Sequence, residues 1–211
     1  MLSLTEPLME GVTIGDDQWE INLSFDNVIR YYEMIEDDQL TDSEKVVEAF
    51  NMFIGSAEEF STEAIVDTVQ RIAAYIQQTP YGNNPGSDGN QPQRDMAGNQ
   101  TQPEHYFSYV QDAEAIYASF IYDYGMDLID MQGKLRWEKF KALLDGLSTK
   151  AILSRIIEIR QRSTTGLEGE DLVQLTEAQS YYALDEYKSA EALDQQAGDI
   201  FSMLAEKAKE G

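Results

Sequence analysis

Apolar residues recur at intervals of three and four along most of this 211-residue chain, which is the spacing of one face of an α-helix. Before residue 80 these stripes comprise Val28, Tyr32 and Ile35; Val46, Phe50 and Phe53; and Ile65, Val69, Ile72 and Ile76. An isolated amphipathic helix cannot bury its own stripe, so such helices must pack on one another. We therefore expect a mainly α protein, a bundle of six to eight helices.

Similar stripes continue after residue 105. They comprise Val110, Ala113, Tyr117, Phe120 and Tyr124; Trp137, Phe140, Leu144 and Leu147; Ile152, Ile156 and Ile159; and Leu172, Leu175, Tyr182 and Leu184. Five large residues of these stripes are assigned to the core: Tyr117, Phe120, Trp137, Phe140 and Leu144. A last stripe, from Leu193 to Ala208, predicts a C-terminal amphipathic helix that packs either on its own bundle or on another chain.

Local patterns before residue 80 predict a β-hairpin and the starts of two helices. Between residues 12 and 25, apolar and polar residues alternate on both sides of a Gly15-Asp16-Asp17 turn, which is the period of a β-strand. We expect a small N-terminal β-hairpin there. Further on, Thr41 and Glu44 form a capping box that opens one helix, and another helix begins near Ser61.

The stretch from Pro80 to Glu104 interrupts the helical pattern. Sixteen of its 25 residues are Pro, Gly, Asn or Gln, so almost none of it can enter a core. This composition is typical of a flexible linker or a long flexible internal loop. The sequence therefore predicts three regions: an acidic helical region at 1–79, the linker at 80–104, and a second helical region at 105–211.

Composition excludes several kinds of chemistry. The chain has no cysteine and one histidine, His105, so it offers no disulfide, no thiolate zinc site and no histidine cluster. Gly133-Lys134 lacks the earlier glycine of a phosphate-binding loop, and Asp127 does not open a calcium loop. No apolar run is long enough to cross a bilayer, and the N-terminus does not resemble a secretory signal. We expect an intracellular protein that is not an enzyme, without cofactor or metal.

Charge is distributed unevenly. The formal net charge is -24, which disfavours binding to nucleic acid and to anionic membranes. Eight bases nevertheless fall between residues 134 and 162, against three acids. This basic surface either lies on the chain's own acidic flanks or docks head-to-tail on a neighbouring copy. The bases taken as more exposed, and so as candidates for partner binding or self-association, are Lys139, Lys141, Arg155 and Arg160.

One run of residues after the linker has a recognisable pattern. Its members are Tyr106-Phe107, Asp112, Ile116-Tyr117-Ala118, Phe120, Tyr124-Gly125, Asp127-Leu128, Leu135, Trp137, Phe140, Leu143-Leu144, Gly146-Leu147, Ile156 and Arg160. The pattern resembles a small bacteriophage family named after its gene product fifteen, closely over residues 106–162 and more loosely over 20–76. Two features depart from the family. Glu138 stands where the family tends to a second aromatic residue, and the linker and the region after Leu184 are longer than usual.

The resemblance implies a tail-assembly chaperone of siphophages and prophages of Gram-positive bacteria. Such proteins hold the tape-measure protein soluble and help tail-tube subunits polymerise around it. The implied partners are the tape-measure protein, the tail-tube protein or a companion tail chaperone, and further copies of the chain, without nucleic acid or membrane. The implied location is the host cytoplasm, with the protein absent from the mature virion. An acidic protein with amphipathic helices suits this role, because a tape measure is a long helical protein with apolar stripes.

The sequence alone leaves two other functions open. The chain could instead be a structural head-to-tail or tail adaptor retained in the virion, which would also be helical and oligomeric. It could also be an acidic DNA mimic that inhibits a host nuclease. A mimic would need carboxylates at phosphate-like separation along one face, and the basic region at 134–162 argues against such a uniform face.

Overall fold

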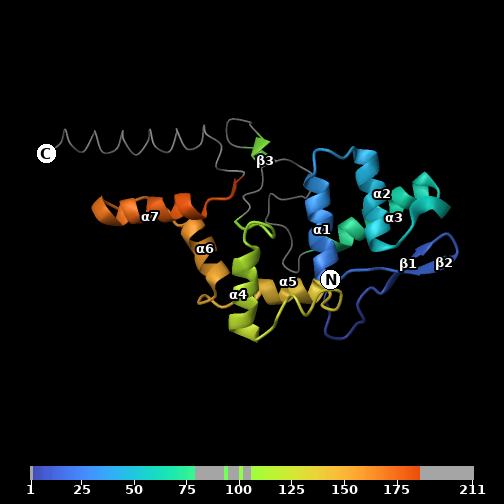
Figure 1. Cartoon of the computed structure of the whole chain (residues 1–211), viewed down its shortest axis with the longest axis horizontal. Coiled ribbons are helices and arrows are strands. Elements are labelled where there is room, and N and C mark those ends of the chain that lie inside the picture. Colours follow the sequence, from blue (N-terminus) through green and yellow to red (C-terminus); the bar gives the residue numbers. More distant parts are fainter. Residues whose placement is uncertain (1, 79–92, 95–99, 102–105, 186–211) are drawn as a thin grey trace. The chain divides into compact units, whose positions relative to one another are not determined.

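The computed structural model of the chain describes residues 2–78, 93–94, 100–101 and 106–185. Within this part of the chain it has seven α-helices and two short two-stranded sheets, which confirms a mainly α fold with an N-terminal hairpin (Figure 1). The second sheet pairs β3 (Gln93–Arg94) with β4 (Gln100–Thr101) inside the predicted linker. The rest of the linker, and the predicted helix from Leu193, lie outside the described residues.

The chain divides into two compact units that do not follow the predicted regions. The first unit is formed by Met1–Glu104 and Phe120–Leu147, and the second by His105–Ser119 and Ser148–Gly211. The sequence had placed all of 105–211 in one region, whereas residues 120–147 belong with the N-terminal residues. The described helices include none that is long and apolar enough to cross a membrane.

The N-terminal hairpin is shorter than predicted. Strands β1 (Gly11–Ile14) and β2 (Asp17–Glu20) pair antiparallel around a turn in which Gly15 has a φ of 64°. The predicted strand up to Phe25 is wrong beyond Glu20, because Phe25 is already the first residue of a helix. The chain leaves the sheet where the Asn22 side chain accepts hydrogen bonds from the backbone N–H and the hydroxyl of Ser24.

Three helices follow the hairpin and pack in sequence: α1 (Phe25–Glu36), α2 (Asp42–Phe53) and α3 (Thr62–Ile76), with a 3₁₀ turn, η1 (Ala57–Glu59), before α3. The capping box at Thr41 and Glu44 is confirmed, and Ser61 caps α3 as expected. The predicted stripe of α3 is buried at all four positions: Ile65, Val69, Ile72 and Ile76.

The buried face of α1 differs from the predicted one. Val28 is buried as expected, but the next buried residue is Tyr31, while Ile35 is 41% exposed. The Tyr31 ring packs against Phe53 of α2, with ring centroids 5.0 Å apart. Tyr32, the predicted member, is only partly buried, so contact with α2 makes Tyr31 the more deeply buried of the two and the predicted stripe fails at Ile35.

An aromatic cluster joins α1 to the segment after residue 120. Helix α4 (Ala113–Tyr124) ends in this unit and α5 (Trp137–Asp145) lies wholly within it. The Phe140 ring stacks on Phe25 at 4.9 Å and on Phe120 at 5.3 Å between centroids. Phe120, Trp137, Phe140 and Leu144 are buried, as assigned, whereas Tyr117 is only partly buried and the adjacent Ile116 is buried instead.

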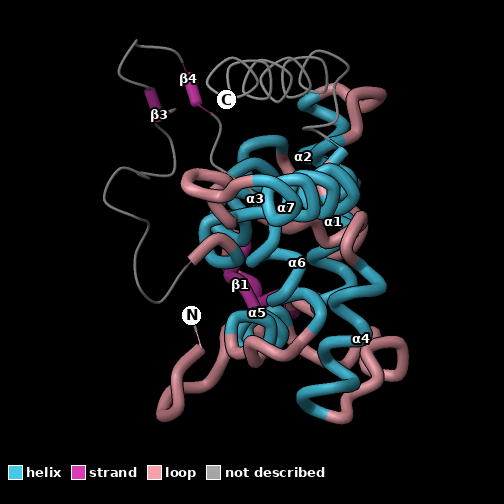
Figure 2. Tube along the Cα trace, turned by 90° about the vertical axis from the view of Figure 1, so that its left-hand side faces the viewer, coloured by secondary structure: helices cyan, strands magenta, loops and turns pink. Residues whose placement is uncertain are grey.

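The second unit contains the start of α4 with α6 (Ile152–Gln161) and α7 (Gly169–Tyr182), drawn among the helices in Figure 2. Ser119 joins two of these helices: its hydroxyl donates to the Ala115 carbonyl at 2.6 Å and accepts the Leu153 N–H at 3.1 Å. The predicted α6 stripe is confirmed at Ile156, which is buried, but not at its start, where Leu153 is buried and Ile152 is 45% exposed. The bond from the Leu153 N–H to Ser119 lies at this point, and helical spacing does not report it.

One buried hydroxyl in α3 has no partner among the described residues: Thr68 Oγ1, on a fully buried side chain. We expect Thr68→Val, which keeps the shape and removes the hydroxyl, to raise the free energy of unfolding by about 1 kcal/mol. Urea unfolding would measure it. Thr176→Val on α7 is the matched control and should destabilise, because the Thr176 hydroxyl donates to the Leu172 carbonyl. A destabilised Thr68→Val variant would contradict the assignment.

Candidate functional site

The four candidate bases fall in different units and different environments. Lys139 and Lys141 lie on α5 in the first unit, whereas Arg155 and Arg160 lie on α6 in the second. The basic stretch at 134–162 is therefore divided between the units after Leu147. Lys139 and Arg155 are exposed, as predicted, while Lys141 is partly buried.

The prediction that Arg160 is one of the more exposed bases is wrong. Its side chain is 9% exposed and forms a two-pronged ion pair with Asp112, at 2.7 and 2.8 Å. The same guanidinium donates to the backbone carbonyls of Tyr106 and Tyr182. Arg160 thus connects the residues before α4, helix α6 and the end of α7, and its charge is used inside the unit.

We expect Arg160→Ala to lower the free energy of unfolding of the second unit by about 3 kcal/mol, because it leaves the Asp112 carboxylate buried without its partner. Hydrogen exchange of α6 and α7 amides would locate the loss. Arg155→Ala is the control on the same helix and should change stability by less than about 0.5 kcal/mol. Equal effects of the two variants would rule out the structural role of Arg160.

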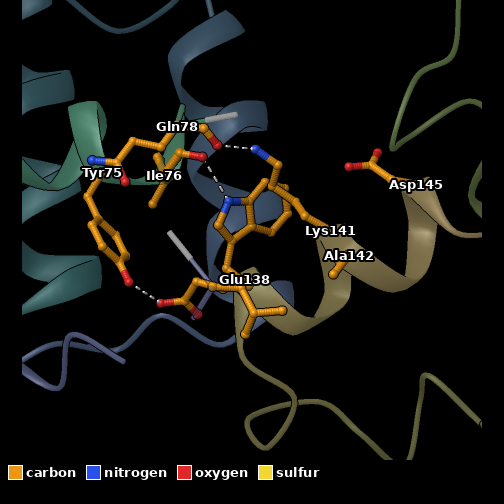
Figure 3. Close-up of a pocket in the computed structure, with 9 residues that line it drawn as sticks. Tyr75, Ile76, Gln78, Glu138, Lys141, Ala142 and Asp145 are labelled. Carbon is orange, nitrogen blue, oxygen red and sulfur yellow. Dashed lines mark hydrogen bonds between the residues drawn. The ribbon is translucent and has the colours of Figure 1, made fainter. Parts of the chain in front are cut away.

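A groove lies between the end of α3 and α5 in the first unit. It has a volume of about 180 Å³. Figure 3 shows how its walls are built: Tyr75, Ile76 and Gln78 come from the α3 side, and Glu138, Lys141, Ala142 and Asp145 from α5. Trp137 and Leu2 complete the lining. The sequence had pointed to Lys141 and Trp137 but not to a groove between two helices.

The α3 end of the groove holds the α5 side in place through two backbone carbonyls. The Trp137 indole N–H donates to the Ile76 carbonyl at 3.0 Å, and the Lys141 ammonium donates to the Gln78 carbonyl at 2.9 Å. The Lys141 nitrogen also lies 6.0 Å from the centroid of the Trp137 ring. Burial lowers the pKa of Lys141, an effect that Asp145 partly opposes. The groove therefore combines apolar side chains with three charged ones, those of Glu138, Lys141 and Asp145.

Glu138 is a residue of this site that the sequence analysis did not select, and it holds the site together. Its carboxylate is buried and accepts hydrogen bonds from the Arg136 guanidinium at 2.7 and 3.2 Å and from the Tyr75 hydroxyl at 2.8 Å. Arg136 also donates to the Met9 carbonyl at 2.7 Å, which adds the N-terminal segment to the network. The sequence did contain one sign of this site: Glu138 is acidic at a position where the resembled family tends to an aromatic residue.

This network gives Glu138 a pH-dependent contribution to stability. Burial raises the pKa of Glu138, but hydrogen bonds from Arg136, from its own backbone and from Tyr75 outweigh it, so the pKa lies below 4.5. We expect Glu138→Gln to lower the free energy of unfolding at pH 7 by about 3 kcal/mol, as for a buried ion pair that loses one partner.

Since the folded-state pKa is depressed, the wild-type advantage is complete above the unfolded value near 4.5 and is lost as the pH falls through the folded value. Urea unfolding of both proteins from pH 7 to pH 3 would test this. Glu48→Gln, at an exposed position on α2, is the control. A difference between wild type and Glu138→Gln that did not shrink below pH 4.5 would contradict the ionised pair.

The arrangement is suited to binding. The part of the chain that the structure describes contains no group of three or more histidine, aspartate or glutamate side chains that could hold a metal ion. His105 lies outside the described residues. What the groove offers is a small cavity beside an indole, lining side chains of both charges, and walls fixed by backbone hydrogen bonds.

Comparison with known proteins identifies one family. A family model described as bacteriophage Gp15 protein matches residues 4–184, which includes both units and every residue of the groove except Leu2. Searches of curated proteins and of solved structures found no match.

Proposed function

Because this chain belongs to the bacteriophage Gp15 protein family, we propose that it is a tail-assembly chaperone. The family supports a phage structural or assembly protein, and the proposal adds the step of phage assembly in which it acts. In that step the protein binds the tape-measure protein, keeps it soluble, and assists polymerisation of the tail tube around it, without catalysis. Family membership over residues 4–184 is the observation that carries the proposal.

The combination of acidic charge and exposed apolar side chains supports this role. Helix α4 buries Phe120, yet Ile121 is 42% exposed and Tyr122 is 64% exposed. In the loop that follows, Ile129 is 64% exposed. A helix that is apolar on its buried side and again on its exposed side offers a surface to a second amphipathic helix. A net charge of -24 keeps such a complex from aggregating.

The proposal has consequences for partners and location. The tape-measure protein is the main partner, and the tail-tube protein or a companion tail chaperone is the second. The protein works as a homo-oligomer in the host cytoplasm and is released before the virion is complete. Nucleic acid and membranes are not among its partners, in keeping with its charge.

We expect coexpression with the tape-measure protein of the same phage to increase the amount of soluble tape measure and to yield a complex measurable by light scattering. The double variant Ile121→Asp with Tyr122→Asp should recover less complex, because it places charge on the exposed α4 face. Val47→Asp is the matched control, since Val47 is also 42% exposed but lies on α2. Circular dichroism would establish that all three proteins are folded.

Two results would overturn the proposal. Unchanged solubility of the tape measure, with no complex, would remove the chaperone role. Detection of the protein in purified virions by mass spectrometry, at a level comparable to other structural proteins, would favour the adaptor retained in the particle.

A further inference from the structure

Helix α4 carries exposed apolar side chains close together on one face. Ile121 is 42% exposed and Tyr122 is 64% exposed, and Ala118, one turn earlier, is exposed as well. Residues three and four apart lie on the same face of a helix, so these three side chains form one patch, here called the α4 patch. In the other described helices, large hydrophobic residues with similar exposure occur singly or eight residues apart. A contiguous apolar patch of this kind marks a binding surface.

The described part of the chain ends beside the start of the same helix. The Gln111 side chain donates to the Ala183 carbonyl and accepts the Asp185 N–H, both at 2.9 Å. Leu184, between them, is buried. Gln111 stands two residues before the first residue of α4, so Asp185 is fixed close to one end of the helix that carries the α4 patch.

The sequence that follows has an apolar stripe at helical spacing, although it lies outside the described residues. The members of the stripe are Leu193, Ala197, Ile200, Leu204 and Ala208. A helix of this length is marginal in water on its own, and Gly198 lowers its propensity further. The segment 193–208 therefore needs an apolar surface on which to pack.

We propose that residues 193–208 pack as a helix on the α4 patch of their own copy and cover it until the tape-measure protein displaces them. The displacement rests on the proposed function, in which the same exposed face of α4 receives the tape measure. The covering itself requires no partner. It would protect the free protein from aggregation through its own apolar patch.

The connecting residues are long enough for this arrangement. Seven residues, 186–192, join Asp185 to Leu193, and they span up to about 24 Å when extended. Along α4 the distance from Ala113 to Tyr122 is about 14 Å, because each helical residue rises by about 1.5 Å. Leu193 can therefore reach any turn of α4. A helix over 193–208 would be about 24 Å long, which is enough to extend past the patch.

Two arguments favour a segment of the same copy over a second copy as the occupant. A second copy brings a net charge of -24, whereas residues 193–208 hold three acids and one base, a net charge of -2. The segment therefore meets much less repulsion. It also avoids the cost of association, because a short linker gives an effective concentration of about 1 mM. With an intrinsic dissociation constant of about 0.1 mM, the patch would be covered about 90% of the time.

Cysteine labelling tests the covering, since the chain has no native cysteine. Ala118→Cys places a thiol in the α4 patch, and its rate of reaction with a maleimide reports how often the patch is open. We expect this thiol to react about ten times faster when the full chain also carries Ile200→Asp and Leu204→Asp, which put charge into the apolar stripe. Ser202→Asp is the matched control. It lies about 200° around the predicted helix from both stripe residues and should leave the rate unchanged.

Val47→Cys, on the exposed side of α2, should react at one rate in all three backgrounds. Circular dichroism would establish that the variants are folded. Equal rates at position 118 in the wild-type background and with Ile200→Asp and Leu204→Asp would overturn the proposal. So would protection that increases with protein concentration, because the occupant would then be a second copy.

Coexpression with the tape-measure protein tests the displacement separately. A patch that is covered about 90% of the time binds a competitor about tenfold more weakly than an open one. The full chain with Ile200→Asp and Leu204→Asp should therefore recover more complex than Ser202→Asp. Equal recovery would overturn the displacement. If no variant forms a complex, the proposed function fails, while the labelling rates still decide whether the patch is covered.

Discussion

Two backbone hydrogen bonds between distant segments hold the first unit together. The Phe25 N–H donates to the Leu135 carbonyl at 2.9 Å, and the Trp137 N–H donates to the Leu23 carbonyl at 2.8 Å. Phe25 is the first residue of α1 and Trp137 is the first residue of α5, and neither helix has a side-chain cap. The first N–H of a helix normally has no partner within the helix. Here the first N–H of each helix donates to a carbonyl in the segment that leads into the other helix. The two helix starts cap each other, and the Trp137 indole adds the end of α3 through the Ile76 carbonyl.

This mutual capping explains why the compact units do not follow the linker. Composition predicts a boundary at 80–104, because sixteen of the 25 residues there are Pro, Gly, Asn or Gln. Yet residues 120–147 are bonded to the N-terminal residues at their helix starts and through the Phe25–Phe140 stack. The buried Glu138 strengthens the same junction, since Arg136 and Tyr75 bond its carboxylate from two different elements. A polar network of this kind is costly when incomplete, so it favours one arrangement of the elements over others.

The sequence predicted those features that depend on neighbouring residues. The capping box at Thr41, the α3 stripe and the hairpin turn at Gly15 are all set within a few residues and are confirmed. Errors arose where distant contacts decide: Tyr31 of α1 is buried against α2, and at the start of α6 Leu153, which donates to Ser119, is buried in place of Ile152. The same holds for charged residues. Arg160 appeared to be a surface base because its partner, Asp112, lies 48 residues away, and no spacing rule reports such a pair.

The weakness of the proposed contacts suits an assembly factor. Exposed apolar side chains on α4 and the groove beside α5 belong to the same unit but to different elements, so one can be altered without the other. Burial of one exposed side chain such as Ile121 against a partner contributes about 2 kcal/mol, which corresponds to about a thirtyfold change in an equilibrium constant. In the proposed role the protein would first hold a partner and then yield it to a growing polymer, and contacts of this size suit that role because stronger ones would retain the partner. The walls of the groove are held by the bonds from Trp137 and Lys141 to backbone carbonyls, so binding there would add little ordering cost.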